Sequence, residues 1–496
     1  MSVPAQSIYA NARRITAKAD VAQRLSRILG SEAKPMKKKL EQDRGFVWMA
    51  RQVEPEMAAA AMTLESDGIG VVEESKRLYP QARLASHLLG FVNIDHRGLE
   101  GMELSFNGAL NGAPGWRSTV RDARGESLIG PWTTQIDPVD GYDLVLTIDS
   151  VAQQVVEEAL EWGVTKYHAK GGSVILMDPH SGSIIAMANW PTYDPNKPGH
   201  AKPEQRRNRA VTDLFEPGST FKIIAASALL EEGRVTPDER FFCEEGNFHT
   251  IGSHILHDHH PHGSLTFAEV IQMSSNIGTS KAAQRLTPDE LYRYIRAFGI
   301  GRRTGVGLPG EISGLINPPS RWSKLSPFII PIGQEVAVTP IQLAVMLSVI
   351  ANGGLRVQPR IIDRVQVADG SIIRSFRREP PVRVISPDTA RTMQTILAGV
   401  VESGTGQLAS VQGLTVAGKT GTAQKLEPNG RYSHSRFVAS FVGFGPVPDP
   451  QFVLVVNIDE PRPLYFGGVV AAPVFKRIVE RLMGYWDLPP TTPVGV

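Results

Sequence analysis

The stretch Glu216-Pro217-Gly218-Ser219-Thr220-Phe221-Lys222 decides how this chain is interpreted. Its Pro-Gly pair can end an extended segment, and the apolar run 221–230 that follows contains no Gly or Pro. This pattern predicts a helix that stops at Gly233 and whose first turn carries Ser219 and Lys222. Residues three apart share a helix face, so the Lys222 amine can reach the Ser219 hydroxyl.

Ser219 and Lys222 have the chemistry of an acyl-transfer nucleophile and its base. A serine hydroxyl is a weak nucleophile until a neighbouring base removes its proton, and lysine can be that base if its site favours the neutral amine. Backbone N–H groups at a helix N-terminus stabilise the negative charge that develops during attack. Ser-x-x-Lys alone is common, and we interpret a second copy at 31–34, in a Lys-rich segment, as solvated surface.

The composition is that of a globular protein. The length of 496 residues predicts two domains. Hydrophobic residues make up 42% of the chain and charged residues 21%, which is ordinary. The net charge of +2 indicates neither a nucleic-acid-binding protein nor an acidic tail. Cys243 is the only cysteine, so no intrachain disulfide can form.

Turn-forming residues at 137–141 mark the expected domain boundary. Before it we predict a strand at 3–10 and helices at 20–29 and 54–65. After it we predict strands at 144–148, 173–177, 183–187, 414–417, 437–444 and 452–458, and helices at 151–167 and 473–483. Strands at both ends with helices between them indicate one sheet built from distant segments, with a helical part inserted.

A second stretch, Ser274-Ser275-Asn276, lies in a helical region that polar residues interrupt. The Ser274 hydroxyl can relay a proton, and the Asn276 amide can hold a peptide carbonyl of a substrate. The alternative is that Asn276 only caps the helix that begins at Ile277.

A third stretch, Lys419-Thr420-Gly421-Thr422, follows the predicted strand 414–417. Lys419 would place a positive charge in a cleft, and Gly421 would let a bound peptide lie against the strand. Thr422 can offer its hydroxyl to a carboxylate and its N–H to an oxyanion. The alternative is an edge-strand lysine that discourages aggregation.

Together, in this order, the three stretches resemble the Ser-x-x-Lys, Ser-x-Asn and Lys-Thr-Gly set of penicillin-binding proteins and class A β-lactamases. The resemblance extends over nearly the whole chain and is to the class B penicillin-binding proteins, closest to the division-specific (septal) peptidoglycan D,D-transpeptidases. It is carried by the segments 79–80, 98–103, 141–149, 178–182, 215–219, 338–343, 351–354, 418–424 and 470–475, and the likeness to the division-specific enzymes by 90–92 and 216–219.

The resemblance implies an α+β or α/β fold with a β-lactamase-like catalytic domain. Residues 1–136 would be a non-catalytic, dimerisation-like pedestal, shortened at its N-terminus relative to the family. Residues 137–488 would be the transpeptidase domain, a five-stranded antiparallel sheet flanked by helices with an all-helical subdomain. Residues 489–496 would be a tail.

The resemblance also implies roles in cross-linking, in which a stem peptide ending in D-Ala-D-Ala acylates the enzyme and a neighbouring stem peptide resolves the ester. β-Lactams would acylate the same serine. Ser219 would be the nucleophile and Lys222 its base, while Ser274 and Asn276 line the cleft. Lys419 would polarise the proton relay. Thr420, Gly421 and Thr422 would bind substrate and complete the oxyanion hole.

No cofactor or metal is expected. The histidines at 249, 254, 257, 259, 260 and 262 lie in a loop without the regular spacing of zinc ligands. We interpret Cys243 as a small buried apolar residue.

By resemblance, the partners would be a membrane glycosyltransferase that polymerises lipid II and other division proteins, with no nucleic acid. The location would be the extracytoplasmic face of the inner membrane. The family's membrane anchor does not precede the segment at 7–10, so the sequence resembles either a truncated ectodomain or a chain with a misplaced start, and membrane anchoring is implied only by the resemblance.

Three alternatives stay open. The first is a hydrolase on the same fold, either a β-lactamase or a D,D-carboxypeptidase. The second is an elongation-specific class B transpeptidase. The third is a non-catalytic β-lactam sensor or scaffold.

Overall fold

The computed structural model describes residues 1–64, 66–118, 120–121, 127–128, 130, 134–251, 254–427 and 430–492. The chain forms two compact units: Met1–Ala82 with Phe91–Leu99, and Arg83–Gly90 with Glu100–Val496. The boundary predicted at 137 lies inside the second unit and stays a prediction. Residue 65 of the predicted helix 54–65 and residues 493–496 of the predicted tail lie outside the described residues.

The first unit is a three-stranded antiparallel sheet in the order β2-β1-β3, with helices packed against it. The strands are β1 (Ser2–Ala10), β2 (Val47–Val53) and β3 (Ile69–Arg77), and the helices are α1 (Lys18–Leu29), α2 (Ala33–Leu40) and α3 (Pro55–Met62). The strand predicted at 3–10 and the helix predicted at 20–29 are confirmed. The helix predicted at 54–65 ends earlier, where the Thr63 hydroxyl donates to the Ala60 carbonyl at 2.7 Å.

The second unit is built on a five-stranded antiparallel sheet in the order β10-β9-β23-β22-β21, as the family resemblance implied. These strands are β9 (Gly171–Met177), β10 (Ile184–Trp190), β21 (Ala417–Leu426), β22 (Tyr432–Gly445) and β23 (Phe452–Asp459). The strand predicted at 414–417 is wrong in extent. Leu414 and Val416 are buried before the strand begins, with Leu414 bridged to Val411 across a turn, and the strand itself contains Lys419 to Thr422.

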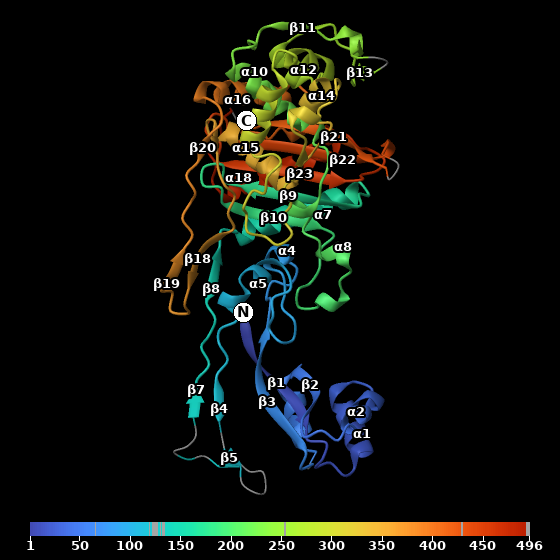
Figure 1. The fold of residues 1–496 in the computed structure, drawn as a ribbon, viewed down its shortest axis with the longest axis vertical. Coiled ribbons are helices and arrows are strands. Elements are labelled where there is room, and N and C mark those ends of the chain that lie inside the picture. The colour runs from blue at the N-terminus through green and yellow to red at the C-terminus, as the bar shows by residue number, and fades with distance from the viewer. Residues whose placement is uncertain are drawn as a thin grey trace. The chain divides into compact units, whose positions relative to one another are not determined.

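Helices cover both faces of this sheet (Figure 1). Val174 and Leu176 of β9 pack toward one set of helices, and Ile175 and Met177 pack toward the other, because successive side chains of a strand point to opposite faces. The first set is α7 (Ser150–Lys166) and α18 (Ala472–Tyr485), and the second is α10 (Lys222–Glu231), α15 (Pro340–Ala351) and α16 (Pro387–Glu402). Every residue of α15 is buried, as expected for a helix that is apolar all round.

The inserted helical part also contains α11 (Phe267–Gln272), α12 (Asn276–Ala283) and α13 (Pro288–Ala297). A small sheet in the order β19-β18-β8 joins β8 (Asp143–Leu146) to the distant strands β18 (Ile362–Gln366) and β19 (Ile372–Ser375). Of the described residues, none belongs to a helix that is both long and apolar enough to cross a bilayer.

Candidate active site

The nucleophile candidate lies on a tight turn at the start of α10. The structure differs from the predicted single helix, because a 3₁₀ turn, η2 (Gly218–Phe221), precedes the α-helix that begins at Lys222. Gly218 enters this turn with φ +56°, a conformation that favours glycine. Ser219 is partly exposed, and its hydroxyl makes no hydrogen bond with the described residues. The nucleophile candidate is therefore accessible.

Lys222 is fully buried beside the second motif. Its Nζ donates to the Ser274 carbonyl at 2.6 Å and to the Ser274 Oγ at 3.3 Å. Burial lowers the pKa of Lys222 to about 7, against an opposing attraction from Asp258 and Cys243. The site thus favours the neutral amine that a general base requires.

Lys419 reaches the same hydroxyl from the sheet. Its Nζ donates to the Ser274 Oγ at 2.8 Å, and its side chain is fully buried although β21 is the edge strand. An edge lysine that only discourages aggregation would be exposed, so that alternative is wrong. Burial, and then repulsion from Lys222, hold the pKa of Lys419 well below its ordinary value.

Ser274 is the point where the two lysines meet. It lies between α11 and α12 with φ +62°, which is uncommon for a residue other than glycine. This strained conformation directs both its carbonyl and its hydroxyl to Lys222. Strain of this kind is concentrated at functional sites, where the surrounding contacts maintain it.

The remaining residues of the third motif pack against η2. A Cβ at Gly421 would lie 2.3 Å from Ser440 Oγ, 2.8 Å from Thr220 Cγ2 and 3.0 Å from Pro217 O. Glycine is therefore required here by the packing of η2 and β22, a reason that the sequence does not reveal.

Thr420 and Thr422 have defined partners. The Thr420 hydroxyl bonds Thr405 Oγ1 at 2.9 Å, and Thr422 Oγ1 accepts from Gly467 N at 3.0 Å. A Cβ at Gly218 would lie 3.1 Å from Thr422 O, so the start of η2 adjoins Thr422. This proximity is what an oxyanion hole made from the N–H groups of Ser219 and Thr422 requires.

Asn276 is held by neighbouring backbone. Its side-chain amide donates to the His257 carbonyl at 2.8 Å. The predicted alternative, in which Asn276 caps the next helix, is wrong, because Ser275 is the N-cap of α12 and accepts from Gly278 N at 2.9 Å.

Sequence reasoning missed Asp258. Its Oδ1 accepts from Asn276 N at 2.5 Å and from Ile277 N at 3.0 Å, and its Oδ2 accepts from Ser275 Oγ at 2.5 Å. Asp258 therefore anchors the start of α12 directly after Ser274. The only sequence signal was a lone carboxylate among histidines.

The histidine-rich loop contacts Phe466, a neighbour in sequence of the residue that bonds Thr422. The His259 ring lies 4.5 Å from both the His260 ring and the Phe466 ring, and Phe466 precedes the residue that donates to Thr422. Among the described residues, no three His, Cys, Asp or Glu side chains are grouped as a metal site would require. Cys243 is buried as predicted.

Two family models match the chain. The model described as "Penicillin binding protein transpeptidase domain" matches residues 172–480, and the one described as "Penicillin-binding Protein dimerisation domain" matches residues 1–146.

Relatives match over most of their length. A probable peptidoglycan D,D-transpeptidase, PenA of Neisseria meningitidis serogroup A, is 34% identical over 100% of this chain and 84% of its own length. Stage V sporulation protein D of Bacillus subtilis is 36% identical over 87% of this chain and 67% of its own length.

Solved structures share the fold. Penicillin binding protein 3 from Mycobacterium tuberculosis, complexed with ampicillin, matches with a TM-score of 0.76 at 35% identity over 86% of this chain and 92% of that one. A peptidoglycan synthetase from Bifidobacterium adolescentis matches with a TM-score of 0.79 at 28% identity, over 100% of this chain and 94% of that one.

Proposed function

This chain belongs to the class B penicillin-binding proteins and is a peptidoglycan D,D-transpeptidase, and on that premise we propose that it cross-links stem peptides at the division septum through an acyl-enzyme on Ser219. The observation that carries this proposal is the meeting of Lys222 and Lys419 on the Ser274 hydroxyl, next to the turn that bears Ser219.

In the first half-reaction, the Ser219 oxygen attacks the carbonyl between the two terminal D-alanines of the donor peptide. Neutral Lys222 takes the hydroxyl proton. The N–H groups of Ser219 and Thr422 bind the oxyanion. The Ser274 hydroxyl passes a proton to the departing amine of D-alanine and regains one from Lys222, which returns to the neutral amine. Lys419 keeps the Ser274 hydroxyl polarised.

In the second half-reaction, an amine from a neighbouring stem peptide attacks the ester. The Lys222–Ser274 pair takes the proton that this amine loses and passes it to the departing Ser219 oxygen, so the enzyme returns to its starting state. Thr420 and Thr422 would hold the donor carboxylate, and Asn276 would hold a peptide carbonyl. A β-lactam would acylate Ser219 by the same attack.

The septal role rests on the resemblance of the 90–92 and 216–219 segments to division-specific enzymes. It implies an extracytoplasmic location at the cell membrane, with a lipid II-polymerising glycosyltransferase and division proteins as partners. Depletion in the source cell would give filaments for a septal enzyme, whereas swollen or rounded cells would indicate the elongation-specific alternative.

Labelling with a fluorescent penicillin tests the catalytic assignment. Ser219→Ala should abolish labelling while its thermal unfolding matches the unmodified chain, and Ser31→Ala, in the surface copy of the motif, should label normally. Intact mass spectrometry should show one long-lived penicillin adduct. Labelling that survives in Ser219→Ala would contradict the proposal, and rapid release of the adduct would favour a hydrolase.

A further inference from the structure

Two adjoining cavities lie in the second unit, and neither contains a proposed catalytic residue. One has a volume of about 450 Å³ and the other about 310 Å³. The segment 357–359 and Glu379 line both, so the cavities form one groove between the loop at 302–307, the segment 356–362 and the extended segment 376–382.

Six arginines line this groove, against one carboxylate among the described lining residues, Glu379. Arg302, Arg303 and Arg356 line the smaller cavity, and Arg360, Arg377 and Arg378 line the larger one.

Most of these arginines have no negative partner. Of these six arginines, only Arg360 forms an ion pair with the described residues, to Asp363 at 3.4 Å. The Nε of Arg360 is buried without a partner among them. Arg302 donates to a backbone carbonyl, that of Arg296. Several surface arginines elsewhere in this unit pair with carboxylates, as Arg285 does with Glu239 and Arg293 with Glu232.

The positive charge is partly buried. Burial, and then repulsion from Arg302, lower the pKa of the half-buried Arg356, and burial with repulsion from Arg296 does the same to Arg302. Cations held together out of water raise the free energy of the folded chain unless an anion faces them. The arrangement therefore favours an anionic ligand.

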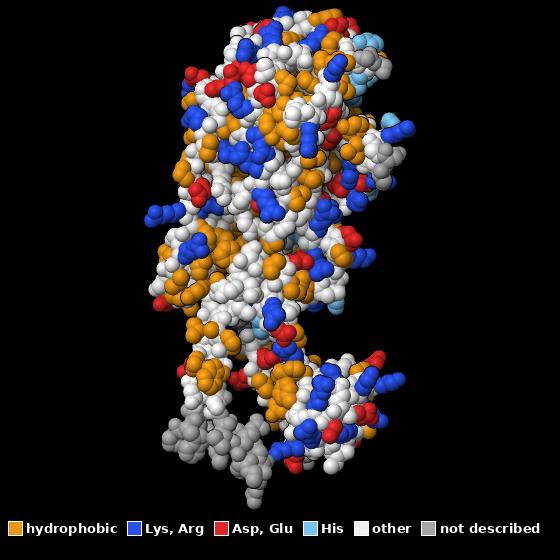
Figure 2. Space-filling model, in the orientation of Figure 1, with side chains coloured by type: hydrophobic (Ala, Val, Ile, Leu, Met, Phe, Trp, Pro, Cys, Tyr) orange, Lys and Arg blue, Asp and Glu red, His pale blue; other side chains and the backbone are white. Residues whose placement is uncertain are grey.

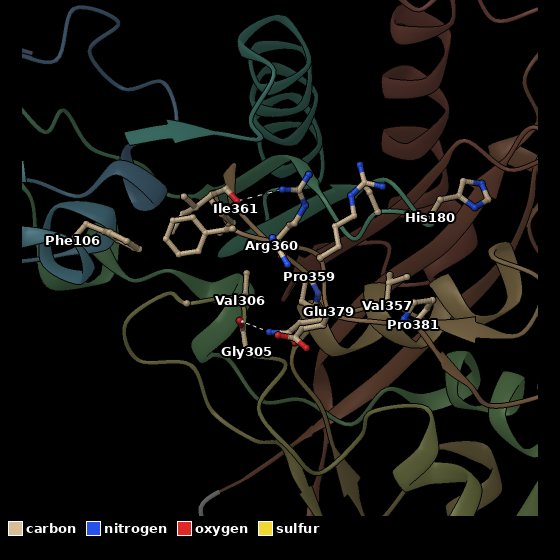
Figure 3. Close-up of a pocket in the computed structure, with 17 residues that line it drawn as sticks. Phe106, His180, Gly305, Val306, Val357, Pro359, Arg360, Ile361, Glu379 and Pro381 are labelled. Carbon is tan, nitrogen blue, oxygen red and sulfur yellow. Dashed lines mark hydrogen bonds between the residues drawn. The ribbon is translucent and has the colours of Figure 1, made fainter. Parts of the chain in front are cut away.

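The larger cavity also has an apolar wall. Figure 3 shows Arg360 near the centre of the lining residues, with Phe106 at one end and His180 at the other. Val306, Ile361 and Phe376 contribute to the wall. Beyond the groove, Ile372 and Ile373 of β19 are exposed, and Figure 2 shows hydrophobic side chains gathered over β18 and β19 with Lys and Arg among them.

We propose that this groove binds an amphiphilic organic phosphate, with the phosphate or diphosphate held by the arginines and an apolar part against the Phe106–Ile361 wall. The planar guanidinium group of arginine can donate two parallel hydrogen bonds to two oxygens of one phosphate. A phosphate or diphosphate offers more such oxygens in one place than the single carboxylates of an acidic peptide. The phosphate can belong to a soluble molecule or to a lipid headgroup, since the chemistry of recognition is the same.

Calorimetry and vesicle sedimentation test the proposal on the full chain. Three probes are compared: inorganic pyrophosphate, vesicles of phosphatidylglycerol in phosphatidylcholine, and hexaglutamate, with pure phosphatidylcholine vesicles as the neutral control. Saturable binding of pyrophosphate, or binding of the anionic vesicles alone, supports the groove and identifies the source of the phosphate. Equal binding of hexaglutamate, or no binding of either phosphate probe, would overturn the proposal.

Variants that remove positive charge from the groove and a variant that removes negative charge should change phosphate affinity in opposite directions. The double variant Arg302→Gln/Arg356→Gln should weaken phosphate binding about tenfold or more. Arg377→Gln/Arg378→Gln, at exposed positions where the substitution removes no buried contact, should do the same. Glu379→Gln should strengthen binding severalfold, because it removes the only lining carboxylate.

The matched control is Arg391→Gln, which removes an exposed arginine of α16 that pairs with Asp388. It should leave phosphate binding unchanged, and all four variants should keep normal penicillin labelling. If the arginine variants and Glu379→Gln change affinity in the same direction, or if the control weakens binding equally, the groove is not the site.

Discussion

Among single residues, Lys222 sets the pH dependence of the first half-reaction. Its pKa is lowered to about 7, so the neutral amine becomes more abundant as the pH rises through that value. Acylation of Ser219 by a fluorescent penicillin should therefore rise about tenfold per pH unit below the pKa and level off above it. Stopped-flow acylation rates across this range check the prediction, and a rate that falls as the pH rises through 7 would contradict it.

Asp258 should tune this profile. Burial lowers the pKa of Lys222, and the Asp258 carboxylate raises it against that effect. Asp258→Asn keeps an oxygen for the N–H groups of Asn276 and Ile277 but removes the charge. The rising limb of the acylation profile should then move to lower pH.

The control for Asp258 is Asp369→Asn, which removes an exposed carboxylate from the turn before β19. Asp369→Asn should leave the pH at which the acylation rate rises unchanged. If Asp258→Asn lowers the rate equally at every pH, its role is only to hold the start of α12.

The sequence could identify Ser219, Lys222 and Lys419 from their motifs, but not Asp258, since its contacts depend on tertiary structure.

Among the elements, the contact of η2 with β21 positions the nucleophile against the third motif. Gly421→Ala would place a Cβ within 3.0 Å of three groups, two of them on Pro217 and Thr220 of the nucleophile segment. We expect a loss of about 1–3 kcal/mol in the free energy of unfolding. Acylation should slow further than this loss of stability explains, because η2 must shift away from Thr422.

Gly199→Ala is the matched control, since a Cβ there meets nothing within 4 Å. It should change neither the unfolding temperature nor the acylation rate. Normal acylation by Gly421→Ala would show that η2 tolerates displacement, contrary to this account.

The spacing of apolar residues in the sequence predicted several helices and strands of the second unit, but not the extent of β21. The helices at 151–167 and 473–483 and the hairpin strands at 173–177 and 183–187 formed close to their predicted bounds. The body of β21 was missed because its polar residues Lys419 and Thr420 are buried although they do not follow an alternating apolar pattern. The strand packs against η2, and Lys419 bonds Ser274. Burial of that kind depends on distant segments.

For the whole molecule, the predicted boundary at 137 can be tested by cutting the chain there. The fragment 137–496 lacks Ala85, whose N–H donates to Glu157 at 2.7 Å, and it lacks the buried Leu88 and Met102. We expect the fragment to unfold several degrees lower than the full chain, since each lost apolar contact costs about 1 kcal/mol or more.

Its acylation rate by penicillin should nonetheless match that of the full chain, because no site residue lies before 137. A fragment that shows native circular dichroism but takes no label would place part of the catalytic requirement in 83–136.

The sequence could predict one sheet made from distant strands. It could not give the order β10-β9-β23-β22-β21, which depends on the pairing of β9 with β23, more than two hundred residues apart.

The two amines that converge on Ser274 have a thermodynamic consequence for ligand binding. Burial, and then repulsion from Lys222, lower the pKa of Lys419 and so favour release of a proton from the pair to the solvent. A ligand that ends in a carboxylate supplies the countercharge, so its association should draw a proton from the buffer. The affinity for such ligands then increases with acidity, and the heat of binding depends on the ionisation enthalpy of the buffer.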